Sequence, residues 1–356
     1  MISKKAKERF NSLLGGYAII HANIKSKTRI AFIIKDIGGE KGYLKDASEL
    51  ATDFVLYNPN IRADKHGVVA LGWKQGVRKA WVTMLGDENN PIILCNDLTF
   101  TYEYPSDYHL DKKIGWSKLP NPINTKKAMI RGILGCKVID NEAYMFGKFR
   151  KLYKRIGIQV WKDISYEDEH PQLHADLEQY KKQKVHLRDV GIGFHAIDGF
   201  NKNDIYACGD GGDCWHYNGK VWRRLDLPVS TDLTSILCAN DGYVYIGLTH
   251  GDIIKGRYKK ESNIENWEIL KGEGGATNTL AWFQDKVYIG SDLGIYTINS
   301  QSNIEQYQFS EKGWHQYSFK HVASCDEALL SYGTDQALIF DGKDWEEIVG
   351  SMVVSN

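Results

Sequence analysis

The chain has 356 residues, of which 42% are hydrophobic, and its 45 basic residues balance 45 acidic ones. This balance argues against a nucleic-acid partner, since proteins that bind nucleic acid usually carry a basic excess or a basic stripe. No run approaches the roughly 18 apolar residues that a membrane-spanning helix needs, and the amino terminus has no apolar core of signal-peptide length. We therefore expect a cytoplasmic protein with no membrane partner.

The six cysteines predict packing rather than chemistry. Five of them stand inside apolar, strand-like runs, where a free cysteine behaves as a small buried hydrophobe. No CxxC pair and no zinc-type Cys/His spacing occurs, so we expect no metal and no cofactor. The six are Cys95, Cys136, Cys208, Cys214, Cys238 and Cys325.

Residues 1–75 form the least regular part of the sequence. The runs at 29–34 and 67–71 look like strands, and residues 45–54 (KDASELATDF) are compatible with a short helix. Four further strand-like runs follow, at residues 79–84, 92–95, 98–102 and 115–119. Short strands at such regular spacing argue for an all-β protein.

From residue 140 onward one short pattern occurs five times. Each copy has an Asp- or Asn-marked turn, then β-branched and aromatic residues, then a glycine, and in most copies a Trp further on. A recurrence of about 40 residues is typical of four-stranded propeller blades. The marker glycines are Gly147, Gly209, Gly247, Gly290 and Gly333.

The clearest copy, residues 191–228, predicts the strand order within a blade. Residues 193–197 are expected to be innermost, with 204–208 and 213–217 next and 221–225 outermost. Asn218 and Gly219 make a strong hairpin turn before the outermost strand, because both residue types tolerate a positive φ.

Sixty-two residues separate the first two marker glycines, and the surplus lies at residues 164–186. Pro171 suits a first helical turn, and Leu173, Leu177 and Tyr180 fall on one face of a helix. Acidic residues precede this stripe and lysines follow it, as the helix dipole favours. We predict a short helical insertion near 164–186, on the same face as the loops between second and third strands.

Together these elements predict an all-β β-propeller that forms a single domain over residues 1–356, with an irregular amino-terminal blade region (1–75) and repeated blades over 76–349. Seven blades are expected, the seventh built from the amino-terminal region, and six are the alternative. Propellers close by sharing one blade between the two chain ends, and residues 348–354 or a strand near 17–20 are candidates for that role.

The repeats resemble bacterial β-propeller proteins of the Asp-box, sialidase-like and photosystem-assembly-factor-like kind, over about residues 128–349. The segment 290–297 (GSDLGIYT) is similar to a loose Asp-box, and 210–215 (DGGDCW) is a weaker echo of one. The resemblance implies a propeller fold and leaves the function open. We cannot place the arginine triad, tyrosine nucleophile and acid of a sialidase on this sequence, and we nominate no catalytic residue.

The densest basic run, residues 148–155 (KFRKLYKR), predicts a partner-binding surface. It replaces the short turn between second and third strands of the other repeats, and Tyr and Arg are common in binding hot spots. A solvated hairpin is the alternative interpretation. The candidate contacts in this run are Arg150, Lys151, Tyr153, Lys154 and Arg155.

The predicted insertion adds His170, His174 and Tyr180 to this surface, because it leaves the same blade. Two histidines four residues apart can share a metal, but no HExxH motif accompanies them, and a solvated helix face explains them without one. Equivalent turns of neighbouring blades complete the rim with Asp210, His250, Asp292 and Asp335.

These features favour a non-enzymatic propeller that binds another protein, because a rigid scaffold can present loops on one face. One form of this hypothesis is a bacterial immunity protein that binds and neutralises a toxin or effector domain. The alternatives are a glycoside hydrolase or lyase, which would show two carboxyl groups about 5–10 Å apart in a central pocket, and a carbohydrate-binding propeller with repeated aromatic pockets.

Overall fold

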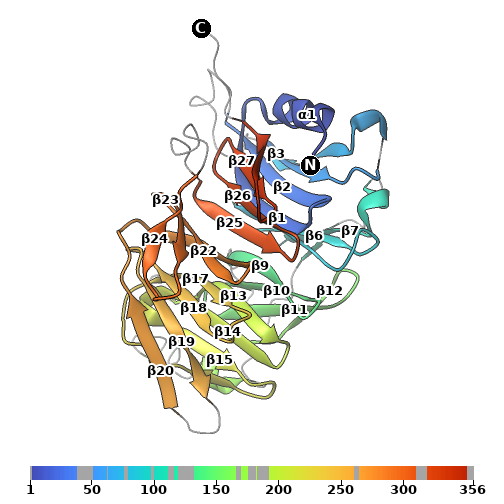
Figure 1. The fold of residues 1–356 in the computed structure, drawn as a ribbon. Helices are drawn as coiled ribbons and strands as arrows, with labels where there is room; N and C mark the ends of the chain where they lie inside the picture. Colours follow the sequence, from blue (N-terminus) through green and yellow to red (C-terminus); the bar gives the residue numbers. More distant parts are fainter. Residues whose placement is uncertain are drawn as a thin grey trace.

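The computed structural model describes residues 2–37, 51–61, 63–75, 79–97, 100–110, 116–118, 132–165, 170–174, 182, 192–259, 264–309 and 319–350. Its strands form seven four-stranded antiparallel sheets, arranged as the blades of a β-propeller (Figure 1). The predicted all-β propeller is confirmed. The amino-terminal region supplies one complete blade, so seven blades are present and the six-bladed alternative is wrong.

In blades 1 to 3 each strand pairs with the next one along the chain. Blade 1 contains β1 (Tyr17–Ser26), β2 (Arg29–Asp36), β3 (Ala51–Tyr57) and β4 (Val68–Gln75). Blade 2 contains β5 (Ala80–Met84), β6 (Ile92–Asn96), β7 (Phe100–Tyr104) and β8 (Trp116–Lys118). Blade 3 contains β9 (Ile133–Ile139), β10 (Glu142–Gly147), β11 (Lys151–Gly157) and β12 (Val160–Asp163).

Blades 4 to 7 repeat this arrangement. Blade 4 contains β13 (Phe194–Asn201), β14 (Asp204–Gly209), β15 (Cys214–Tyr217) and β16 (Trp222–Arg224). Blade 5 contains β17 (Leu233–Cys238), β18 (Val244–Leu248), β19 (Ile253–Lys259) and β20 (Ile264–Leu270). Blade 6 contains β21 (Thr277–Phe283), β22 (Lys286–Ser291), β23 (Gly294–Ile298) and β24 (Ile304–Gln306). Blade 7 contains β25 (His321–Cys325), β26 (Ala328–Tyr332), β27 (Ala337–Phe340) and β28 (Trp345–Val349).

The first strand of every blade lies nearest the propeller axis. β1 contacts β5 and β25, and the first strands of the other blades contact one another in the same neighbour-to-neighbour order. Blade 4 has the strand order β13-β14-β15-β16. The order that the sequence predicts for residues 191–228, from innermost to outermost, is therefore confirmed.

Hydrophobic cores lie between the blades rather than inside them. Each of the seven interfaces holds its own cluster of buried side chains. In β14, Ile205 and Ala207 enter the cluster shared with blade 3, whereas Tyr206 and Cys208 enter the one shared with blade 5. Because a second strand is buried on both faces, its sequence is a continuous apolar run without polar alternation.

In blades 3 and 4 the marker glycine near the end of the second strand is explained by a close backbone approach, whereas a Cβ on Gly247 would meet the side chains of Ser235 and Thr277. A Cβ atom on Gly147 would lie 1.8 Å from the carbonyl oxygen of Gly132, and one on Gly209 would lie 1.7 Å from that of Gly193. A larger residue would force the second strand away from the first one. The repeated glycine is thus a requirement of the blade and not a binding feature.

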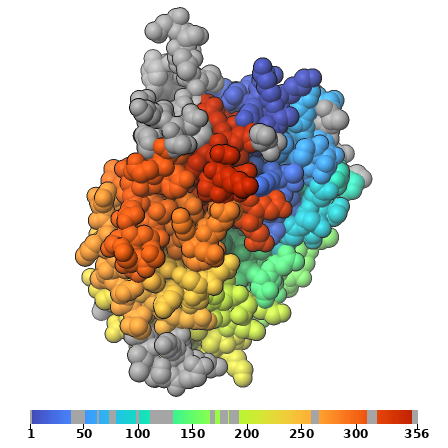
Figure 2. All heavy atoms as spheres, viewed as in Figure 1, coloured from blue at the N-terminus to red at the C-terminus, as the bar shows by residue number. Residues whose placement is uncertain are grey.

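Among the described residues the ring closes without a shared blade, so the predicted closure is wrong for residues 17–20 and for 348–350, and residues 351–354 lie outside the described part of the chain. All strands of blade 1 come from residues 17–75, and all strands of blade 7 come from residues 321–349. The two blades meet directly, and the Ile19 N–H donates a hydrogen bond of 2.6 Å to the Thr334 carbonyl. Figure 2 shows the blue amino-terminal residues lying beside the red ones of blade 7.

Helix α1 (Lys4–Leu14) covers this joint. Ala6, Phe10 and Leu14 lie on one helical face and pack into the cluster between blades 7 and 1. The Ser3 hydroxyl caps the helix by accepting the Ala6 N–H at 3.2 Å, as preferred N-cap residues do. The helix therefore bridges the outer parts of the first and last blades.

Two side chains of α1 attach it to opposite sides of the joint. Arg9 Nε donates to the Val68 carbonyl of blade 1 at 2.8 Å, and Lys7 pairs with Glu346 of blade 7 at 2.9 Å. Packing and polar contacts of α1 do here what a shared blade would do by strand pairing.

The predicted helices agree with the structure less well than the predicted strands do. Sequence analysis missed α1, although its cap and its i, i+4 apolar spacing are recognisable signals. The helix considered at 45–54 is wrong at its end, because Ala51–Tyr57 form β3, and its start lies outside the described residues. In the predicted insertion one 3₁₀ turn, η4 (Pro171–Leu173), is described, and most of 164–186 lies outside the described residues.

Three other 3₁₀ turns complete the described secondary structure. They are η2 (Ala63–Lys65), η3 (Asp107–His109) and η6 (Asp210–Gly212). No helix in the described part of the chain is long and apolar enough to cross a membrane.

Candidate functional site

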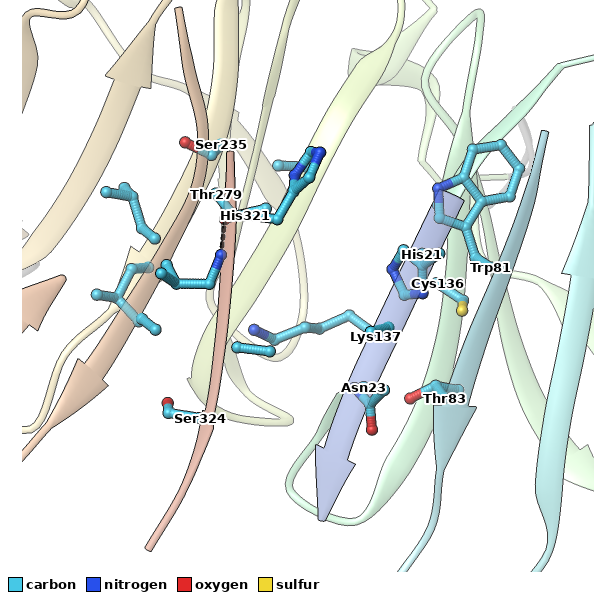
Figure 3. A pocket seen from close by; sticks show the side chains of 18 of the residues that line it. His21, Asn23, Trp81, Thr83, Cys136, Lys137, Ser235, Thr279, His321 and Ser324 are labelled. Carbon is cyan, nitrogen blue, oxygen red and sulfur yellow. Dashed lines mark hydrogen bonds between the residues drawn. The ribbon is translucent and has the colours of Figure 1, made fainter. Parts of the chain in front are cut away.

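The propeller axis holds a cavity of about 670 Å³ that is lined by the first strands of all seven blades. Its walls carry hydroxyls, amides and imidazoles between aliphatic side chains. Figure 3 shows Lys137 extending into the middle of the cavity, with His21 on β1 and His321 on β25, the neighbouring first strand. The channel is therefore polar and is not filled by apolar side chains.

Five first strands turn one extra residue toward this channel. The pairing between first and second strands skips Ile20, Leu134, His195, Thr234 and Asn278, and all five line the cavity. A β-bulge of this kind inserts an unpaired residue and re-aims its side chain. The bulges recur near the start of the first strands, so they form a ring at one mouth of the channel.

Two of the bulge residues hold aspartates of the candidate rim. His195 Nε2 lies 3.0 Å from Asp210 Oδ1, and the Asn278 amide donates to Asp292 Oδ1 at 3.2 Å. The hydrogen bond with Asp210 raises the pKa of His195 above its usual value. The amide of Asn278 and the nearby Lys320 ammonium lower the pKa of the Asp292 carboxyl. The rim is thus charged and is anchored to the channel wall.

The two other channel histidines are held neutral by their surroundings. Burial lowers the pKa of His21 to about 3, and the Val82 N–H donates to its Nδ1 at 3.3 Å. Burial likewise lowers the pKa of His321 to about 4. An imidazole whose Nδ1 accepts a hydrogen bond carries its proton on Nε2. At neutral pH these residues offer polarity without charge.

The carboxylate pair required by the hydrolase alternative is not found among the described residues of the channel wall. Asp326 is the one acidic residue among those that line the cavity. Lys137, the cation nearest the centre in Figure 3, pairs with Asp198 at 3.5 Å. A paired acid and base for glycosidic cleavage would need two carboxyl groups facing one space.

The structure places Arg150 inside the protein. Its side chain is 1% exposed, and its Nε and Nη2 donate to the two carboxylate oxygens of Asp213 at 2.6 and 3.0 Å. Its Nη1 donates to the Leu173 carbonyl at 2.7 Å, and its guanidinium lies 4.9 Å from the Trp215 ring centroid. The expected surface position of Arg150 is wrong, because a carboxylate from the next blade draws it inward.

The rest of the basic run belongs mainly to the third strand, so it is not an enlarged loop. The turn consists of residues 148–150, and β11 starts at Lys151. Lys151 pairs with Asp163 at 3.2 Å, and Tyr153 is 6% exposed. Burial raises the pKa of the Tyr153 hydroxyl. A partner role for these residues stays a prediction, although their exposed area is small.

Lys154 and Arg155 are partly exposed but also paired. Lys154 lies 2.6 Å from Glu142 of the adjacent strand. Arg155 lies 3.0 Å from Glu103 of blade 2. The charge of the run is therefore largely neutralised by internal carboxylates, which the sequence-based interpretation did not foresee.

The structure does bring the predicted insertion next to the basic run. Arg150 donates a hydrogen bond to Leu173 of η4, which lies within the insertion. Beyond the insertion, the Phe149 N–H donates to the Ile192 carbonyl at 2.8 Å. His170 is buried with its ring edge-on to Tyr217, whereas His174 is hydrogen-bonded through Nε2 to the Ser165 carbonyl. Within the described residues no cluster of metal-ligating side chains is found.

Tyr180 lies outside the described residues. The remaining rim residues occupy equivalent turns between second and third strands, as predicted. Asp210, His250, Asp292 and Asp335 follow β14, β18, β22 and β26 respectively. His250, Asp292 and Asp335 are exposed, while Asp210 is partly buried.

Sequence reasoning missed the ring of bulges and the channel histidines. The available signal was a polar residue inside an otherwise apolar first strand, such as Thr234 before the run Ser235–Cys238. Such a residue reads as a local irregularity in one copy. Its recurrence at the same place in several blades is what marks the channel wall.

Comparison with known proteins gives one relative and a broad structural likeness. The chain is 31% identical over 216 residues to the immune protein Tsi7 of Pseudomonas aeruginosa, which covers 60% of this chain and 63% of that protein. The match therefore spans less than two thirds of the relative. No protein-family model matches the chain.

Among solved structures, two propellers are similar over nearly the whole length. Virginiamycin B lyase from Staphylococcus aureus has a TM-score of 0.52 at 8% identity and covers 89% of this chain and 91% of its own. YCF48, solved with a bound peptide, has a TM-score of 0.56 at 10% identity and covers 92% and 93%. At such low identity these likenesses establish the propeller fold alone.

Proposed function

We propose that this chain is an immunity protein that neutralises a toxin by binding it. The observation that carries the proposal is the 31% identity to the immune protein Tsi7. The seven-bladed scaffold supports it, because rigid strands hold exposed turns on one face in fixed positions. The proposed action is stoichiometric binding in the cytoplasm.

The proposed contact surface is the rim of the channel mouth, formed by the turns between second and third strands. His250, Asp292 and Asp335 are exposed at equivalent turns, and Leu293 beside them is 53% exposed. A mixed surface of charged groups around an apolar residue suits a protein partner, because charge steers association and apolar contacts hold the complex. The anchoring of Asp292 by Asn278 keeps this surface in shape before binding.

Co-expression tests the proposal directly. Genes for immunity proteins would be expected beside the gene of the toxin they neutralise, so the probe is the toxin domain encoded next to this chain. Bacteria carrying that toxin domain in the cytoplasm should survive when the full chain is present and die when it is absent. A variant with Asp292→Lys and Asp335→Lys should protect less well if the rim contributes.

Two results would contradict the proposal. The first is death of the co-expressing cells despite soluble chain at the level of the toxin. The second is a gene neighbourhood without any toxin. Survival combined with an unimpaired rim variant would keep the immunity function and remove the rim from the contact surface. A matched control is Lys343→Asp in the exposed turn of blade 7 at the other end of the strands.

A further inference from the structure

We infer that the turn joining β11 and β12 is an apolar anchor that inserts into an uncharged, concave groove of the toxin. This turn, residues 156–160, is named the blade 3 tip. The inference rests on the proposed function, because that function supplies the protein partner. It assigns the main contact of blade 3 to aliphatic side chains, where the sequence suggested basic ones.

The blade 3 tip exposes three aliphatic side chains within five residues. Ile156 is 60% exposed, Ile158 is 61% exposed and Val160 is 51% exposed. Single exposed aliphatic residues are common on protein surfaces, whereas three within five residues of one turn concentrate apolar area where a partner can bury it. These three are not covered by any described part of the chain.

The same position in other blades is polar, which gives an internal comparison. In blade 4 the Asn218 side-chain oxygen accepts the N–H groups of Lys220 and Val221 at 3.1 and 3.0 Å. In blade 7 Asp341 accepts those of Lys343 and Asp344 at 2.9 and 3.0 Å. Such side-chain caps are the usual way to close a tight turn.

Blade 6 closes its turn in the same way. The Asn299 side-chain oxygen accepts the N–H groups of Gln301 and Asn303 at 2.9 and 3.0 Å. Blade 3 alone among these four blades lacks a polar residue at the first position of the turn, where Ile158 stands. Blade 3 therefore differs from these blades in having an apolar residue, Ile158, at an exposed position where they have a polar one.

A buried carboxylate of the neighbouring blade holds the tip instead. Glu103 of blade 2 has a fully buried side chain, and it accepts the Gln159 N–H at 3.1 Å and the Arg155 guanidinium at 3.0 to 3.3 Å. Gln159 has a φ of 55°, a conformation that costs energy for a residue other than glycine. The tip is thus fixed in one strained shape from outside its own hairpin.

This fixed shape is what a binding anchor requires. An interface residue that is already ordered loses little conformational entropy on binding. Arg155 is neutralised by Glu103, and no residue from 156 to 160 is charged. The complementary surface on the partner is therefore an apolar groove without a charge at its base.

The size of the patch argues against a second copy of this chain as the occupant. Three aliphatic side chains present on the order of 300 Å² at most, whereas a stable interface buries about 800 Å² on each partner. The tip joins a third and a fourth strand, so it lies at the opposite end of the strands from the rim. The toxin, which supplies the remaining area by contacting the rim and reaching around the outer edge of blade 3, is the occupant that these observations favour.

The test measures binding of the purified, catalytically inactivated toxin domain encoded beside this chain to the full-length protein. The principal variant carries Ile156→Thr, Ile158→Thr and Val160→Thr, which keep the β-branched shape favoured in strands. We expect its Kd to rise by about 100-fold, since a few central residues dominate binding energy. Ile158→Asp alone serves as a second variant should the triple change impair folding.

The matched control is Val221→Thr in the equivalent hairpin of blade 4. Val221 is 51% exposed, as Val160 is, but it stands alone behind a polar turn. Its Kd should stay within about twofold of the wild-type value. Thermal unfolding of all variants should match that of the wild type, because the substituted side chains are exposed.

The outcomes separate this inference from the proposed function. If the wild-type chain does not bind the toxin domain, the proposed function fails and the inference fails with it. If the wild type binds and the folded tip variants bind equally well, the inference alone is overturned. Sedimentation of the free proteins tests the alternative that the tip binds a second copy of this chain. If the wild type is a dimer, and the tip variants are monomers with unchanged affinity for the toxin, the inference is also overturned.

Discussion

The ring is held differently at the joint of blades 7 and 1 and at the interface of blades 3 and 4. The first joint brings the two chain ends together and is covered by the apolar face of α1 around Phe10. The second is crossed by the chain itself and contains the buried pair of Arg150 and Asp213. At the joint of blades 7 and 1, where the chain does not connect the two blades, apolar packing holds them together. At the interface of blades 3 and 4, the charge pair is favourable in one geometry, so it fixes the orientation of the two blades.

Removing Arg150 should give the largest loss of stability. Arg150→Met leaves the Asp213 carboxylate buried without its buried cation and its two hydrogen bonds from Arg150, which costs about 3–5 kcal/mol of unfolding free energy. Arg224 provides a matched control, because it lies 3.7 Å from the same carboxylate but its side chain is 60% exposed. Arg224→Met should change stability by less than about 1 kcal/mol.

Chemical denaturation of both variants measures this difference. Adding Asp213→Leu to Arg150→Met should recover part of the loss, since the double variant buries no unpaired charge. Recovery stays incomplete because Asp213 also accepts the Trp215 indole N–H at 2.9 Å. Equal effects of Arg150→Met and Arg224→Met would show that the buried pair has no special role.

Shortening Phe10 should weaken the other joint by a somewhat smaller amount. Phe10 is fully buried, with its ring 5.6 Å from that of Phe32 and 5.9 Å from that of Tyr57. Phe10→Ala should cost about 3 kcal/mol, near the low end for large core residues, because a helix at the edge can shift into the space. Hydrogen exchange should then increase most in β4 and β28, the two strands that α1 contacts.

The control for this joint is Lys4→Ala on the exposed face of the same helix. Lys4 lies 4.0 Å from Glu8, and both side chains are largely exposed, so the change should be close to neutral. A stable Phe10→Ala protein with unchanged exchange in both strands would contradict the bridging role of α1.

Glu103→Gln should lower the free energy of unfolding by an intermediate amount, because it weakens only the contacts that hold the blade 3 tip. The neutral amide keeps the shape but weakens the bonds from Arg155 and Gln159, at a cost of about 1–3 kcal/mol for a buried charged hydrogen-bond partner. Glu268→Gln is the control, since Glu268 is 57% exposed and lies 3.7 Å from Lys255. Urea unfolding compares the two, and a loss as small as that of the control would argue against external support of the tip.

The smallest expected effects concern pH, and they differ in sign between the channel and its rim. Because the pKa values of His21 and His321 are lowered in the folded protein, these imidazoles stay neutral near pH 6, whereas in the unfolded chain they become protonated. Stability is then lost as pH falls below about 6.5, by about 0.7 kcal/mol for each histidine between pH 7 and 6. His21→Asn should reduce that loss in a urea series at both pH values.

His195 should behave in the opposite way. Its pKa is raised mainly by the hydrogen bond with Asp210, so its contribution is complete below the ordinary value of about 6.5 and disappears as pH rises through the raised pKa. Replacing Asp210 by Asn should lower the pKa of His195 observed by NMR. An unchanged titration would contradict the ion pair at the rim.

The sequence was sufficient for the features that each blade repeats locally. Second strands such as Asp204–Gly209 are recognisable because their apolar runs end in a glycine that the backbone approach requires. The rim turns at Asp210, His250, Asp292 and Asp335 were placed correctly for the same reason, since equal positions in a repeat fall on the same face.

The tertiary structure decided which charges face solvent. Asp213 lies 63 positions after Arg150, and Glu103 lies 52 positions before Arg155. No local pattern joins residues so far apart, so the basic run read as an exposed surface until the neighbouring blades supplied its carboxylates. Sequence periodicity determines the blades because strands and turns are local, whereas burial of a charge depends on what the next blade brings against it.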